Sequence, residues 1–287
     1  MMTKRYEKYA YSMVLPVMVL IVLFKIYPVL YSIIGSFFTV SAGQSQRFVG
    51  ITNFISVFKE TVFQNSFFVT IKFNILLTPI QIILAILLAM MVNTKIKGIH
   101  VFRTIFYMPV GVPISIAAII WGMMLMANGG LINGLLSLIR IPPQPFLTSK
   151  DQALYAIIIM ATWQGVGYWM VFILAGLQGI PDEIYEAARI DGSGATQTFF
   201  AVTLPSLRNV IIFVLVSDSV VNILLFAPMY LLTDGGPQRS TNLLMLEAYK
   251  TLYRSTDPSR AYVIITSLIA LGSLVVLLQM FLLREKD

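Results

Sequence analysis

The sequence contains no cysteine and a single histidine, His100. The absence of cysteine excludes disulfides, thiolate metal sites and cysteine nucleophiles, and one histidine argues against a histidine-based catalytic or metal cluster. Charge is also scarce, because 11% of the 287 residues are charged and 57% are apolar, whereas soluble domains carry about 25% charged residues. We therefore predict an integral membrane protein with no catalytic residues and no bound metal.

Six apolar stretches reach the roughly 20 residues that a helix needs to cross a bilayer. They comprise residues 12–38, 67–92, 104–126, 154–178, 209–231 and 262–283. These stretches are continuously apolar, whereas strands of a membrane barrel alternate in polarity. The first stretch exceeds the apolar region of about 7 to 15 residues in a signal peptide, so we expect it to be retained. The sequence predicts an all-α, polytopic membrane protein with about six transmembrane helices in a single domain, 1–287.

Basic residues indicate the orientation. They gather before the first stretch and between the second and third stretches: Lys4, Arg5, Lys8, Lys95, Lys97 and Arg103. Because lysine and arginine are enriched in cytosolic segments, both termini are expected in the cytosol. The net charge is +7, and the basic residues form no continuous run. This distribution favours contact with anionic lipid over binding of nucleic acid.

The cytosolic segment 179–205 is the most informative part of the chain. Pro181 suits the first turn of a helix, Asp182 and Glu183 favour a helix N-terminus, and Gly192 can take the left-handed conformation that ends a helix. The helix between them carries small residues that permit close approach and polar residues that can anchor a partner: Ala187, Ala188, Glu186, Arg189 and Asp191. We predict a short docking helix there, and a second short helix over 130–139 on the outer membrane surface.

The order Glu186-Ala187-Ala188, Asp191-Gly192, a phenylalanine and Leu204-Pro205 resembles the "EAA" loop of permease subunits of binding-protein-dependent ABC importers. Three further stretches look like the carbohydrate-uptake subfamily: 48–54, 163–165 and 232–237. This subfamily includes the large permease subunits of maltose, lactose and glycerol-phosphate transporters.

The resemblance implies a type I ABC importer permease fold in a prokaryotic cytoplasmic membrane. Its expected partners are a second, homologous but non-identical permease, cytosolic ATP-binding subunits and an extracytoplasmic solute-binding protein. The chain contains no Gly-Lys dipeptide and hence no P-loop, so ATP and magnesium are expected on the partner ATPase and no cofactor in this chain. The residues that the resemblance assigns to ATPase coupling are Glu186, Ala187, Ala188, Asp191 and Gly192.

Polar residues inside the apolar stretches point to a substrate pathway, because polar groups in a membrane usually face a partner helix or a pathway. In each of two stretches, residues three and four apart share a helical face. The candidates are Gln164, Gly165 and Tyr168 in the fourth stretch and Asp218, Val221, Asn222 and Leu225 in the fifth. The resemblance supports the same positions, where amide, carboxylate and aromatic groups suit a sugar.

Alternatives remain at this stage. Asp218 could pair with Lys72 or with the second permease, and Tyr168 and Trp163 could be ordinary core aromatics. The expected function is ATP-driven import of a carbohydrate, with an oligosaccharide favoured because an ionised Asp218 disfavours an anionic substrate. Import of glycerol phosphate or another small polar solute is the alternative, followed by an autonomous secondary transporter or channel. An intramembrane enzyme is disfavoured, since the chain lacks H-E-x-x-H and Ser193 has no plausible base.

Overall fold

The computed structural model describes residues 2–39, 46–94 and 96–283. Within these residues the elements are helices, apart from one antiparallel strand pair in which Phe38 lies opposite Phe48, so the all-α prediction is confirmed. The elements up to the third helix are α1 Met2–Ile21, the π-helix η1 Val22–Ile26, α2 Tyr27–Gly35, β1 Phe38–Thr39, β2 Arg47–Phe48 and α3 Thr52–Lys59.

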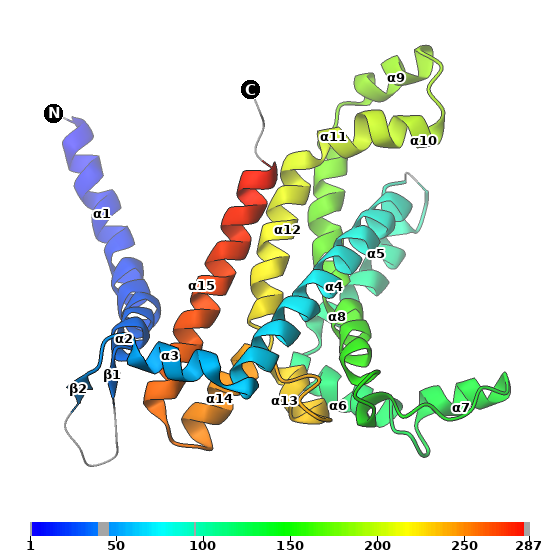
Figure 1. The fold of residues 1–287 in the computed structure, drawn as a ribbon. Helices are drawn as coiled ribbons and strands as arrows, with labels where there is room; N and C mark the ends of the chain where they lie inside the picture. Colours follow the sequence, from blue (N-terminus) through cyan, green and yellow to red (C-terminus); the bar gives the residue numbers. More distant parts are fainter. Residues whose placement is uncertain (1, 40–45, 95, 284–287) are drawn as a thin grey trace. The chain divides into compact units, whose positions relative to one another are not determined.

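Longer helices follow in the rest of the chain (Figure 1). They are, with the short helical turns between them, α4 Thr61–Val92, α5 Ile99–Tyr107, the 3-10 helix η2 Met108–Gly111, α6 Ile114–Met124, α7 Leu131–Leu138, the 3-10 helix η3 Phe146–Thr148, α8 Ala153–Gln178, α9 Asp182–Ile190, α10 Ala195–Thr198, the π-helix η4 Phe199–Thr203, α11 Leu204–Ser206, α12 Arg208–Ile223, α13 Ala227–Thr233, α14 Leu244–Tyr253 and α15 Pro258–Leu283. The short helix predicted over 130–139 is α7.

Among the described residues, four helical segments are long and apolar enough to cross a membrane: Tyr11–Gly35, Thr61–Val92, Ala153–Gln178 and Pro258–Leu283. Two bent pairs raise the number to six if each pair is one span: Ile99–Gly111 with Ile114–Met124, bent by 96°, and Ala195–Ser206 with Arg208–Ile223, bent by 67°. The prediction of about six spans is therefore confirmed for the described residues.

The third and fifth apolar stretches each contain a break in the helix that hydropathy does not indicate. In the third stretch Val112 is extended, with ψ 124°, because a residue that precedes proline, here Pro113, is pushed out of the helical region. The fifth stretch is helical only to Ile223, and a separate helix starts at Ala227 with Pro228 in its first turn. Proline suits a helix start but breaks a helix interior.

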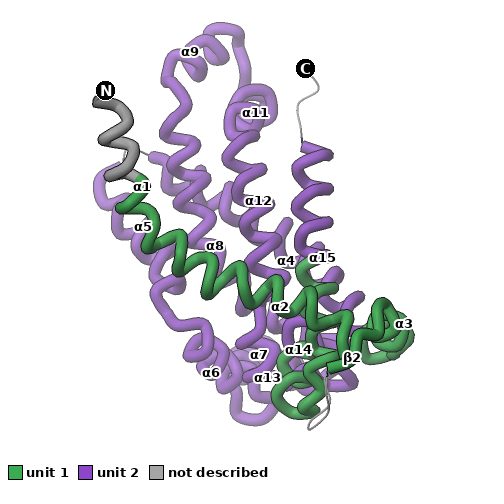
Figure 2. The backbone as a smooth tube through the Cα atoms, turned by 90° about the vertical axis from the view of Figure 1, so that its left-hand side faces the viewer, with its two compact units in different colours: residues 1–64, 247–269 green, residues 65–246, 270–287 purple. Residues whose placement is uncertain are grey.

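The chain divides into two compact units, one of residues 1–64 with 247–269 and the other of 65–246 with 270–287 (Figure 2). The single domain expected from the sequence stays a prediction. In the first unit, the guanidinium of Arg260 donates hydrogen bonds to Glu60 Oε2 at 2.7 Å and to Glu247 Oε1 at 2.8 Å, and it also bonds Thr251. Arg260 thus connects α14 and α15 to the residue before α4.

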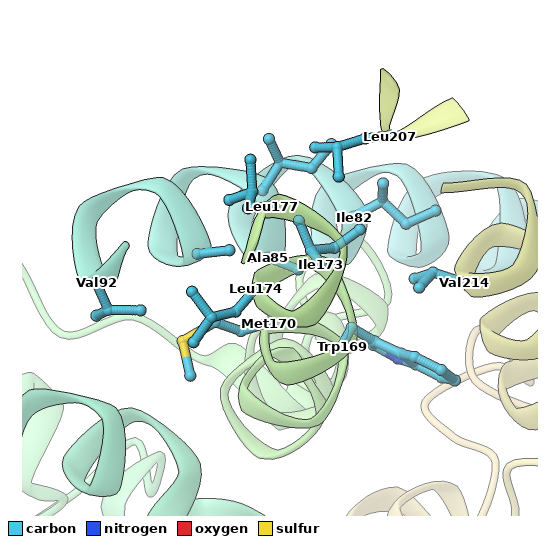
Figure 3. Close-up of a cluster of buried hydrophobic side chains, with 12 residues drawn as sticks. Ile82, Ala85, Val92, Trp169, Met170, Ile173, Leu174, Leu177, Leu207 and Val214 are labelled. Carbon is cyan, nitrogen blue, oxygen red and sulfur yellow. The ribbon is translucent and has the colours of Figure 1, made fainter. Parts of the chain in front are cut away.

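The core of the second unit lies where α8 meets α4 and the start of α12 (Figure 3). It consists of buried side chains, among them Ile82, Ala85, Val92, Trp169, Met170, Ile173, Leu174, Leu177, Leu207 and Val214. Small residues bring backbones close together in membrane helices. At Gly167 of α8, an added Cβ would lie 2.1 Å from the carbonyl oxygen of Phe106 in α5, so this contact requires glycine.

Lys95 and residues 284–287, which enter the predicted orientation, lie outside the described residues. Figure 1 shows that α9 and α10 lie at one end of α8 and α12, whereas α6, α7 and α13 lie at the other end. The second unit therefore separates the predicted docking helix from the loops of the opposite side.

Candidate functional site

A pocket of about 280 Å³ lies between α4, η2, α6, α8 and α12. All seven residues predicted for the substrate pathway line it: Gln164, Gly165, Tyr168, Asp218, Val221, Asn222 and Leu225. The other lining residues are Gln81, Val110, Ile114, Ala161 and Trp169. The two helical stripes predicted from the sequence thus line the same cavity.

One wall of this pocket is a hydrogen-bonded polar cluster centred on Asn222. The Asn222 amide donates to Asp218 Oδ2 at 3.0 Å, to Gln81 Oε1 at 3.0 Å and to Thr78 Oγ1 at 3.1 Å. Asp218 and Asn222 are 1% and 4% exposed, and Asp218 Oδ1 has no hydrogen-bond partner among the described residues. Buried acceptors without a partner are costly, and this oxygen is itself almost fully buried in the wall of the pocket.

Gly165 makes room for the amide of Gln81. An added Cβ at Gly165 would lie 2.6 Å from Gln81 Nε2, and the same nitrogen donates to the carbonyl of Ala161 at 3.0 Å. Gln81 is therefore held at both ends of its amide, by α8 and by Asn222 of α12. The expectation that Gly165 leaves space on this face agrees with that packing.

Another part of the pocket lining is aromatic and apolar. Tyr168 is 41% exposed and packs edge-on against Trp169 at 4.8 Å and against Phe172 at 5.1 Å, measured between ring centroids. Trp163, the aromatic residue that precedes Gln164 in the sequence, does not line the pocket. It packs against Trp121, with the ring centroids 5.7 Å apart. The cavity combines hydrogen-bonding groups with an aromatic face, the composition expected of a site for a small polar ligand.

Lys72 does not neutralise Asp218. Its ammonium lies 5.3 Å from the centre of the Tyr155 ring, and it lines a different pocket from Asp218. Within the described chain, neither residue forms an ion pair with the other, so the alternative of an Asp218–Lys72 pair is wrong.

The sequence analysis missed three residues of this site that carry polar side-chain atoms: Thr78, Gln81 and Trp169. Thr78 and Gln81 are polar residues inside an apolar stretch, which is the same signal that identified Asp218 and Asn222. Applied to the stretch 67–92, that signal would have found them. No comparable sequence signal identifies Trp169 as part of the site, because its burial depends on packing between α4, α8 and α12.

The predicted docking helix is α9, and its ends match the sequence pattern closely. Gly192 has φ +78°, the Gly192 amide donates to the Arg189 carbonyl, and the Ser193 amide donates to the Ala188 carbonyl, both at 3.0 Å. These two bonds form a Schellman motif, in which glycine accommodates the left-handed residue. Pro181 lies just before the helix, with ψ 138°, rather than in its first turn.

Residues predicted for coupling divide between the two faces of α9. Glu186, Ala187 and Asp191 are exposed, whereas Ala188 is 7% exposed and faces the chain itself. On that inner side the Thr203 hydroxyl, in η4, donates a hydrogen bond of 3.3 Å to the hydroxyl of Tyr185. Ala188 therefore packs α9 onto its own chain, and Glu186, Ala187 and Asp191 are the ones open to a partner.

Comparison with known proteins gives a consistent family. The model of the "binding-protein-dependent transport system inner membrane component" family matches residues 81–286. The trehalose/maltose transport system permease protein MalF of Thermococcus litoralis is 34% identical over 250 residues, covering 85% of this chain and 83% of that protein. The lactose transport system permease protein LacF of Rhizobium radiobacter is 33% identical, covering 98% and 96%. The sn-glycerol-3-phosphate transport system permease protein UgpA of Yersinia pestis is 31% identical, covering 93% and 91%.

Solved structures agree on the fold. A chain from a bacterial ABC transporter involved in the import of the acidic polysaccharide alginate aligns with a TM-score of 0.85 at 22% identity, covering 98% of this chain and 96% of that chain. A second structure, of the alginate transporter with a periplasmic protein bound to an alginate pentasaccharide, aligns with a TM-score of 0.81 at 22% identity, covering 97% and 93%. The chain therefore belongs to the inner membrane components of binding-protein-dependent transport systems, with the fold of an ABC importer permease, and is a multi-pass transport subunit rather than an enzyme.

Proposed function

We propose that this chain forms half of the pathway through which an ABC importer moves a carbohydrate, an oligosaccharide, across a prokaryotic cytoplasmic membrane. The observation that carries the proposal is that one pocket is lined by Asp218, Asn222, Gln81 and Tyr168. Sugars present hydroxyl groups at their edges and C–H groups on their ring faces. Amide and carboxylate groups suit the edges, and an aromatic ring suits the faces.

The substrate class also draws support from the relatives. Two of the proteins named above are permeases of trehalose/maltose and lactose systems. Glycerol phosphate is the second candidate, because the UgpA proteins are 31% identical to this chain. The pocket favours the neutral sugar, since its one charged residue, Asp218, would repel a phosphate if ionised.

Three kinds of partner complete the transporter in this proposal. A homologous, non-identical second permease supplies the other half of the pathway, an extracytoplasmic binding protein delivers the substrate, and cytosolic subunits bind ATP and magnesium. Both termini and α9 then lie in the cytosol. The exposed side of α9, with Glu186, Ala187 and Asp191, is the surface that we assign to the ATP-binding subunit.

The mechanism follows from differential binding. Closure of the ATP-binding subunits moves α9, and η4 passes that movement to α12, which carries Asp218 and Asn222. The pocket is then exposed to each side of the membrane in turn, because ATP and substrate favour different arrangements of the spans. No chemical step takes place in this chain.

An uptake assay tests the proposal. It uses cells that lack the native gene and carry wild-type or variant copies. We expect labelled di- and oligosaccharides to enter with the wild type, and Asn222→Ala to reduce uptake at least several-fold, since the substitution removes the centre of the polar wall. Ile119→Ala, in α6 away from this pocket, is the matched control. Uptake of glycerol 3-phosphate with no sugar uptake would overturn the carbohydrate assignment, and equal uptake by Asn222→Ala would overturn the assigned pocket.

A further inference from the structure

Lys72 places a positive charge in α4, a helix that is otherwise apolar enough to cross the membrane. Charges within such segments are costly and normally have a partner. The ammonium lies 5.3 Å from the centre of the Tyr155 ring, and in the part of the chain described here it forms no ion pair. A cation–π contact leaves the positive charge intact, so this lysine can still bind an anion.

Lys72 lines a pocket of about 420 Å³ at the start of α8. The lining residues are Val69, Lys72, Lys150, Asp151, Leu154, Tyr155 and Ser240. None of them lines the pocket of Asp218 and Asn222. The pocket is thus a separate site of mixed character, with two ammonium groups, one carboxylate, two hydroxyl groups and two apolar side chains.

The position of this pocket along α8 matches the headgroup level of a bilayer. Helix α8 begins at Ala153, directly after Lys150 and Asp151, and its other end continues toward α9. The pocket therefore lies at the end of a membrane span, on the side opposite to α9. We expect the headgroups of the leaflet on that side at this depth, because lysine side chains near the ends of spans reach the interface.

The charges fit one class of ligand better than others. A neutral sugar has no need of two ammonium groups, whereas a phosphodiester carries the negative charge that they attract. Asp151 adds a negative charge to the same pocket, which disfavours a purely anionic headgroup and favours one that also carries an ammonium. The apolar side chains of Val69 and Leu154 suit the glycerol and acyl part of such a lipid.

We propose that this pocket binds the headgroup of an amine-bearing phospholipid, with its phosphate held by Lys72 and Lys150 and its ammonium held by Asp151. A lipid bound there connects α4, the start of α8 and the loop that carries Ser240. It would stabilise the end of the second unit that is opposite to α9, independently of which substrate the chain transports.

A measurement of lipid retention tests this proposal. It uses the purified full-length chain together with the subunits that accompany it. After delipidation, the protein is exposed to phosphatidylethanolamine, phosphatidylglycerol or phosphatidylcholine of identical acyl chains, and bound lipid is counted by native mass spectrometry. We expect phosphatidylethanolamine to be retained best. Lys72→Gln should weaken retention about fivefold, the equivalent of roughly 1 kcal/mol per basic residue near a membrane surface.

The controls separate charge from folding and lipid from free anion. Lys72→Arg should restore retention, and Lys25→Gln, which removes a charge from another span, should leave it unchanged. Asp151→Asn should lower retention of phosphatidylethanolamine relative to phosphatidylglycerol. Equal retention by Lys72→Gln and wild type, preference of the wild type for phosphatidylglycerol, or full displacement of lipid by inorganic phosphate would each overturn the proposal.

Discussion

The hydroxyls of Tyr185 and Thr203 lie 3.3 Å apart and join α9 to η4. Thr203 is 6% exposed, and the chain continues from it through α11 to α12, the helix that carries Asp218 and Asn222. A π-helix such as η4 often occurs at a functional position. This contact therefore connects the docking helix to the segment that leads to the pocket.

Removal of that hydrogen bond should uncouple ATP hydrolysis from uptake. Tyr185→Phe loses a bond worth about 1 kcal/mol, and Thr203→Val loses that bond together with the one from Thr203 to the Thr198 carbonyl. In both variants α9 should move without carrying η4 as efficiently. In vesicles that contain the assembled transporter, we expect a several-fold fall in substrate moved per ATP hydrolysed. Thr196→Val is the control, because Thr196 is exposed on α10. An unchanged ratio in both variants would contradict this role.

Gly192 is the second test of the docking helix. In the described part of the chain no atom lies within 4 Å of a Cβ added there, so the obstacle to substitution is the positive φ of +78°. Gly192→Val should cost about 1 to 2 kcal/mol or more in this conformation, distort the end of α9 and abolish coupled uptake. Gly192→Asn, which tolerates the left-handed region better, should retain most uptake. Full uptake by Gly192→Val would show that the turn is unimportant.

Gly165 provides a test of the pocket that leaves the docking helix intact. Gly165→Ala forces a Cβ against Gln81 Nε2, at 2.6 Å without movement, and Gln81 cannot swing away freely because both ends of its amide are bonded. We expect a raised KM for uptake with basal ATP hydrolysis unchanged. Gly134→Ala, with no atom within 4 Å of its added Cβ, should behave like wild type. An unaltered KM in Gly165→Ala would argue against substrate contact at this face.

Gly167 tests helix packing rather than transport. Gly167→Ala places a Cβ 2.1 Å from a carbonyl oxygen of the neighbouring helix, and overpacking of this kind costs typically about 1 to 3 kcal/mol. Thermal unfolding of the purified protein in detergent should occur at a lower temperature. Gly272→Ala, in a helix with open space at the same point, should be neutral or stabilising. Equal unfolding temperatures for the two variants would contradict the close approach of α8 and α5.

Local sequence rules were sufficient where a feature depends on residues close together in the chain. The spacing of Asp218 and Asn222 placed both on one helical face, and Gly192 marked the end of α9. Both depend on backbone geometry within a few residues. The same reasoning gave the ends of the span 154–178 to within one residue of α8.

Other features depend on contacts that local patterns do not encode. The apolar stretch is continuous through Val112 and Pro113, so hydropathy alone does not reveal the 96° bend between the helices on either side. The bond from Asn222 to Gln81 joins residues 141 positions apart. Ala187 and Ala188 are identical and adjacent, and only the packing of α9 on η4 decides that the second one is buried.

The most direct test of the account is cysteine crosslinking at position 186. The chain has no native cysteine, so Glu186→Cys introduces its only thiol, at an exposed site on α9. In native membranes, we expect a bifunctional reagent to join this residue to a subunit with a P-loop, whereas Ser137→Cys on α7, at the opposite end, should not give that product. Absence of a P-loop subunit from the position 186 product, or its capture from position 137, would contradict an ATP-coupled permease that docks through α9.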